Sequence, residues 1–120
     1  MPIDPRLEAT FTLGEREITL RPTFATLVAV EKAAGRPILA FMQDVGASVN
    51  VTMEEFVVVA VAAFKANGTN LKVAEVGEAL LEYGYTKFTM EFCTFLLTGF
   101  QGPSSLPQPN AEEAAAEGEQ

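Results

Sequence analysis

The stretch TMEEFVVVAVAAFKANG, residues 52–68, decides the fold. It opens with Thr52 and Glu55, a capping-box pair whose hydroxyl and carboxylate each accept a hydrogen bond from a backbone N–H of the first helical turn. The run FVVVAVAAF that follows is apolar on every side, as in a helix that other elements surround. The closing Asn-Gly pair tolerates the left-handed backbone of a helix end. The sequence therefore predicts a helix over about 53–66 at the centre of the core.

On the N-terminal side of this helix, the sequence predicts a β-hairpin. Apolar and polar residues alternate over 8–13 and again over 17–21, and the polar segment GERE connects the two runs. A two-stranded sheet is only marginally stable alone, so we expect the hairpin to pack on helices.

Four further helices are expected around the central one. A helix over 24–34 is bounded by a possible cap at Thr23 and by Gly35, and a short helix follows Pro37. A helix over 71–83, capped by Thr69 or Asn70, is expected to turn Val73 and Leu81 inward, and a helix over 87–98 opens at Thr86.

The predicted fold class is α+β, with an N-terminal β-hairpin packed on a small bundle of four to five α-helices. Residues 1–100 form a single domain in this interpretation, because 120 residues leave room for one hydrophobic core. Residues 101–120 carry three prolines and four glutamates and little that could be buried, so they are predicted to be a disordered acidic tail.

Composition excludes several classes of function. The chain has no histidine and a single cysteine, which removes histidine-based catalysis, histidine-ligated metal sites and disulfides. The eight Lys and Arg residues are scattered and face 16 acids, which argues against nucleic-acid binding. The first residues lack the basic and apolar regions of a signal peptide, so none is expected, and no apolar run approaches the about 20 residues that span a bilayer. We expect a cytoplasmic protein that binds neither membrane nor nucleic acid.

The residues that could carry chemistry have simpler interpretations. Glu75, Glu78 and Glu82 share one helical face, which could hold a metal but is better explained as a solvated surface. Cys93 has no nearby base that would activate it, so it is interpreted as a packing residue. Phosphate-binding glycine motifs are missing. The sequence predicts a protein that is not an enzyme and uses no cofactor or metal.

The last predicted helix is apolar on two faces. One stripe fits the core, and a second, on roughly the opposite side, is formed by Met90, Cys93, Leu97 and Phe100. Either the hairpin or the helix over 24–34 covers this second face, or it is a surface for a partner or for self-association, since exposed apolar patches usually mark interaction sites. Phe41 and Met42 of the short helix could extend that surface.

The order of these parts resembles a known family. The hairpin is followed by RPTFATLVAVEKAAGRPI, by the capped apolar helix quoted above, and by LKVAEVGEALLEYGYTKFTMEFCTFLLTGF. Over about residues 8–100 this arrangement is similar to the tail assembly chaperones of gene transfer agents and related long-tailed phages. The resemblance is carried by the helix over 23–35 and by VGEALLEYG, which are patterns of apolar and small residues.

The resemblance implies a non-enzymatic protein that binds the long tape measure protein and assists polymerisation of the tail tube around it. Such a chaperone self-associates, works in the cytoplasm of the bacterial host and is not expected in the mature particle. Two alternatives stay open: a structural neck or tail-terminator subunit, and a cytosolic protein-binding regulator. They differ in whether the chain is found in finished particles and in which genes lie beside its own.

Overall fold

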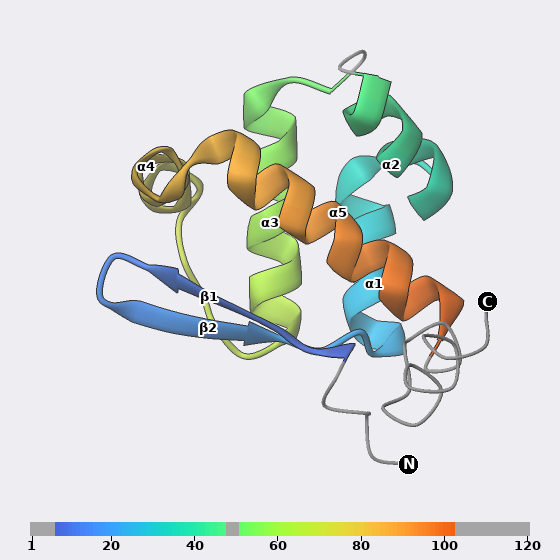
Figure 1. Cartoon of the computed structure of the whole chain (residues 1–120), viewed down its shortest axis with the longest axis horizontal. Helices are drawn as coiled ribbons and strands as arrows, with labels where there is room; N and C mark the ends of the chain where they lie inside the picture. The colour runs from blue at the N-terminus through green and yellow to red at the C-terminus, as the bar shows by residue number, and fades with distance from the viewer. Residues whose placement is uncertain (1–6, 48–50, 103–120) are drawn as a thin grey trace, which may run out of the picture.

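A computed structural model describes residues 7–47 and 51–102 of the chain (Figure 1). Within these residues an antiparallel hairpin precedes five helices, which confirms the predicted α+β class. The elements are β1 (Ala9–Leu13), β2 (Arg16–Leu20), α1 (Phe24–Ala34), α2 (Ile38–Ala47), α3 (Met53–Ala66), α4 (Val73–Tyr83) and α5 (Tyr85–Gln101). The predicted tail begins within α5, and its residues 103–120 lie outside the described part of the chain.

The hairpin has a tighter turn than the sequence predicted. Arg16 pairs with Leu13, so only Gly14 and Glu15 connect the strands, and the expected four-residue connection is wrong. Gly14 has φ of 65°, a left-handed conformation that such a short turn requires and that glycine adopts without strain. The register aligns Phe11 with Ile18 on the buried face, so one side of the sheet packs on the helices.

Helix α3 lies at the centre of the core, as predicted. It packs most extensively against α1 and also contacts α4 and β2, while α5 crosses in front of it (Figure 1). The Phe56 ring is fully buried and meets the rings of Phe88 and Phe92, with centroids 5.9 and 5.6 Å apart. The helix is not enclosed on every side, however, because Val58 is exposed.

The N-terminal caps of α1 and α3 follow the sequence. Thr23 Oγ1 accepts a hydrogen bond from Thr26 N at 3.1 Å, and Thr52 Oγ1 accepts one from Glu55 N at 3.0 Å. The other half of the predicted capping box is wrong, because the Glu55 carboxylate binds Arg36. A side chain with a charged neighbour in reach makes a stronger hydrogen bond there than to a backbone amide.

The boundaries of α4 and α5 differ from the prediction. Helix α4 begins later, with Lys72 at its N-cap in place of Thr69 or Asn70, and Val73 and Leu81 are exposed where they were expected to be buried. Helix α5 starts at Tyr85, directly after Gly84, so Thr86 lies inside the helix. Gly84 has φ of 112°, which lets one residue break the helix and turn the chain.

Candidate partner-binding surface

Helix α5 presents two apolar faces, and only one of them is buried. Phe88, Phe92 and Leu96 are fully buried in the core, as their spacing predicted. On the second face, Met90 is 66% exposed, Phe100 51% and Leu97 43%. Among the described residues, therefore, neither the hairpin nor α1 covers the second face.

The two candidate residues on α2 have different environments. Phe41 is fully buried and stacks on Phe56 with a centroid distance of 6.3 Å, so its proposed place on a binding surface is wrong. Helical spacing explains the difference, because adjacent residues of a helix point about 100° apart. Met42, the next residue, is only partly buried and faces the space between α2 and α5.

That space is an apolar groove. A hollow of about 450 Å³ is lined by residues that include Met42, Met90 and Cys93, and a second of about 320 Å³ is lined by residues that include Met42, Cys93 and Leu97. Both hollows are lined by Met42 and Cys93, so they lie next to each other, and together they are here called the α2–α5 groove. In Figure 1, α5 runs diagonally across the front of the molecule with α2 beside it.

The groove includes the Cys93 thiol. Burial raises the pKa of this thiol to about 11, so it stays protonated at neutral pH. A neutral thiol behaves as a small apolar group and is a poor nucleophile. Cys93 therefore contributes packing surface to the groove, as its sequence context indicated.

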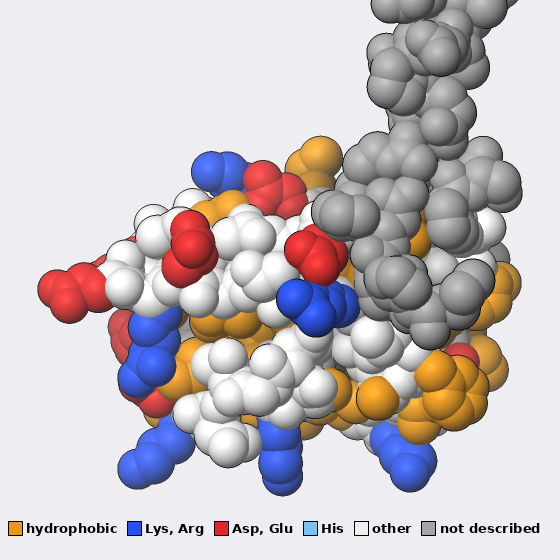
Figure 2. Space-filling view, turned by 90° about the horizontal axis from the view of Figure 1, so that it is seen from below, with side chains coloured by type: hydrophobic (Ala, Val, Ile, Leu, Met, Phe, Trp, Pro, Cys, Tyr) orange, Lys and Arg blue, Asp and Glu red, His pale blue; other side chains and the backbone are white. Residues whose placement is uncertain are grey.

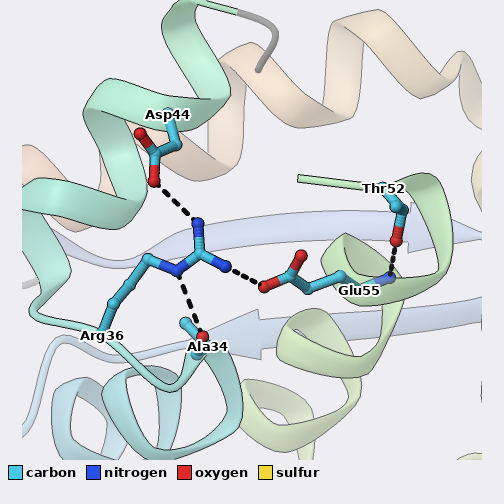
Figure 3. Close-up of polar contacts among 5 residues, drawn as sticks. All are labelled: Ala34, Arg36, Asp44, Thr52 and Glu55. Carbon is cyan, nitrogen blue, oxygen red and sulfur yellow. Dashed lines mark hydrogen bonds and ion pairs between the residues drawn. The ribbon is translucent and has the colours of Figure 1, made fainter. Parts of the chain in front are cut away.

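A polar cluster around Arg36 connects α2 to its neighbouring helices (Figure 3). The Arg36 guanidinium donates to Asp44 of α2 at 2.7 Å and to Glu55 of α3, and it also donates to the carbonyl of Ala34. Glu31 of α1 accepts a hydrogen bond from the Ile38 amide at 3.0 Å, which caps the start of α2. These contacts join α2 to α1 and α3, in addition to the buried side chains Ile38 and Phe41.

Sequence reasoning missed this cluster. Its members are 8 and 19 residues from Arg36, and no local pattern pairs side chains at such separations. The only available signal was an Arg between Gly35 and Pro37, where a helix cannot continue and a charged side chain is free to reach back to neighbouring helices.

Exposed apolar side chains also occur outside the groove, among them Phe24, Met53 and Leu81. Seen from below, charged side chains surround the protein, some of them next to a side chain of opposite sign, and apolar side chains show between them as well as at the end opposite the hairpin turn (Figure 2). The acidic face of α4 is exposed, and its Glu75 lies 4.0 Å from Arg16. Within the described residues, no group of three or more His, Cys, Asp or Glu side chains could hold a metal ion. The helices described here are also too short or too polar to cross a membrane.

Comparison of the chain with protein-family models, with curated proteins and with solved structures finds no match.

Proposed function

We propose that the protein is a tail assembly chaperone of a gene transfer agent or long-tailed phage, which binds the tape measure protein and assists tail tube assembly without catalysing a reaction. The observation that carries the proposal is the α2–α5 groove, an exposed apolar depression between two helices. A groove of this kind accommodates the apolar face of an amphipathic helix. The sequence resemblance supplies the identity of the client.

The chemistry of the surface suits a holding role. A long helical protein with apolar stripes aggregates unless those stripes are covered, and each chaperone copy would cover one short stretch through its groove. The chain carries a net charge of −8, so coated clients repel one another and stay soluble. Affinity per copy need not be high, because many copies on one client act together and can be displaced one at a time by the growing tube.

The proposed chaperone acts inside the host cell and only during assembly. The chaperone works in the cytoplasm of the bacterial host, self-associates along its client and leaves before the particle is complete. Mass spectrometry of purified particles tests this last point. Finding the chain there in stoichiometric amounts would favour a structural neck or tail-terminator subunit.

Co-expression with the tape measure protein tests the proposed client. We expect tagged chaperone to retain the tape measure protein in solution, and the double variant Met90→Glu, Leu97→Glu to lose that retention. Both side chains are exposed on the groove face, so the helix signal in circular dichroism should not change. Leu81→Glu is the control for a charge added outside the groove, because Leu81 is apolar and 56% exposed but lies on α4.

The possible outcomes of this experiment either support or contradict the proposed client. Retention by the wild type and by Leu81→Glu, but not by the double variant, supports the proposal. Failure of the wild-type protein to retain the tape measure protein contradicts it, and so does retention that is undiminished in the double variant.

A further inference from the structure

The two helices that form the walls of the groove carry three charged side chains, Asp44 on α2 and Lys87 and Glu91 on α5. Asp44 is bound to Arg36 on the side facing α3. On α5, Lys87 and Glu91 are one turn apart and both engage Tyr83: the Lys87 ammonium lies 4.6 Å from the ring centroid, and the Tyr83 hydroxyl donates to Glu91 at 2.5 Å. Each charge is thus held by a partner outside the groove.

As a result, none of the described residues that line the two hollows is charged, although 20% of the chain is. The polar groups that remain belong mainly to threonines such as Thr86 and Thr94 and to Gln43. A charged side chain that is covered in this groove would lose water and find no opposite charge among these residues, which is unfavourable unless the charge stays at the rim. The groove therefore discriminates against ions of either sign.

The shape of the groove limits its occupant as well. Its lining on α5 extends from Tyr85 to Leu97, which are twelve residues apart and so about 18 Å along the helix axis. Two helices that flank a depression offer ridges and grooves to a third helix, whereas an extended strand would find no free backbone partners on either wall. About three turns of helix fill that length.

We infer that the α2–α5 groove takes a single amphipathic helix of about three turns whose buried face carries no Lys, Arg, Asp or Glu. This inference rests on the proposed function for the identity of the natural client, and it adds the rule by which client segments are chosen. Segments are selected by apolar residues at i, i+4 and i+7 and not by charge. The flexible Met42 and Met90 side chains adapt the walls to different apolar residues, so many stretches of one long client qualify.

Synthetic helical peptides test the rule directly. The first probe is an N-acetylated, amidated peptide of about 14 residues of Ala and Gln with Leu at i, i+4 and i+7, labelled for fluorescence anisotropy. We expect saturable binding whose Kd changes less than about twofold between about 0.05 and 0.5 M NaCl, because no ion pair forms. Replacing the central Leu with Glu or with Lys should each weaken binding at least tenfold.

Variants of the protein identify the groove as the binding site. Met90→Glu and Met90→Lys should each raise the Kd at least tenfold, and the neutral Met90→Gln, of similar length, should raise it only a few-fold. Leu81→Glu, with its added charge on α4, should bind like the wild type. Tighter binding of the Lys or the Glu peptide than of the neutral peptide, or strong salt dependence, would overturn the inference.

Failure of this inference and failure of the proposed function give different results. If the tape measure protein is retained but the neutral peptide does not bind, the selection rule is wrong and the chaperone role stands. If the neutral peptide binds as expected but the tape measure protein is not retained, the groove has the inferred chemistry and a different client.

Discussion

Asn67 shows how much a single side chain can contribute in a small domain. The sequence indicated only that it ends α3. In the structure its amide nitrogen donates to Thr26 Oγ1 at 3.0 Å and to the Ala63 carbonyl at 2.8 Å, while its oxygen accepts from the Arg21 amide at 2.9 Å. One residue therefore joins the end of β2 to α1 and α3, and it satisfies the hydroxyl of the fully buried Thr26.

Replacing Asn67 should reduce the stability of the fold. We expect Asn67→Ala to lower the free energy of unfolding by about 2 kcal/mol, because three hydrogen bonds are lost and the buried hydroxyl keeps only one partner. Urea unfolding followed by circular dichroism measures the change. Asn70→Ala, at an exposed position three residues later, should stay within about 0.5 kcal/mol of the wild type. Equal effects of the two substitutions would contradict the assignment.

Cys93 provides a second prediction at the residue scale. With its pKa raised to about 11 from the ordinary 9.0, the thiol should react with iodoacetamide about 100-fold more slowly at pH 8 than an exposed thiol, since only the thiolate reacts. The raised pKa also stabilises the fold below about pH 9, and that contribution is lost as the pH rises towards 11. A rate profile with a midpoint near 9 would show that the thiol is solvated and that the groove is open to water there.

At the scale of elements, α2 depends on the polar cluster around Arg36. We expect Arg36→Ala to lower the free energy of unfolding by about 1–3 kcal/mol, because Asp44 and Glu55 then lose the cation between them. Amide hydrogen exchange in α2 should rise at least tenfold while exchange in α3 changes little, since α2 opens locally. Lys32→Ala removes an exposed cation of α1 and serves as the control. Unchanged exchange in α2 would mean that Ile38 and Phe41 alone hold it.

The sequence predicts elements well where the signal is local. The caps at Thr23 and Thr52 and the span of α3 follow from residue types within one turn of the helix end. The predicted starts of α4 and α5 are wrong because tertiary context decides where these helices begin. Thr69 and Asn70 are residue types that often cap helices, yet they lie in the connection between α3 and α4. The tight hairpin turn was missed since its polar residues fit either length.

The candidate surface was predicted only in part. The helical period correctly assigned the apolar residues of α5 to a core face and a second face, because this assignment needs only the spacing of residues within one helix. The same reasoning placed Phe41 beside Met42 on the surface, although a single residue step rotates one into the core and the other into the groove. Which residues of α2 face α5 depends on how α2 is held, and its contacts include those of Arg36 with Asp44 and Glu55, which are distant in sequence.

At the scale of the whole molecule, two features oppose each other. The sequence pI is about 4.4, and at neutral pH the net charge of −8 keeps copies apart. The α2–α5 groove and its exposed Met90, Leu97 and Phe100 favour association, because covering them removes apolar surface from water. We therefore expect the balance between net charge and exposed apolar surface to decide how readily the free protein self-associates.

Lowering the pH shifts that balance in a predictable direction. As the pH falls from 7 towards 4.4, carboxylates are protonated, repulsion disappears and association through the groove should increase, as measured by static light scattering. Met90→Glu with Leu97→Glu should reduce the association at a matched distance from each variant's own pI, whereas Leu81→Glu with Val73→Glu adds the same charge on α4 and should not. When the two double variants are compared at the same distance from their own pI, their net charges are similar. Any remaining difference in association then reflects which apolar surface was replaced. Equal suppression by both double variants would mean that the protein associates through apolar surface in general and that the groove has no special role in contacts between copies.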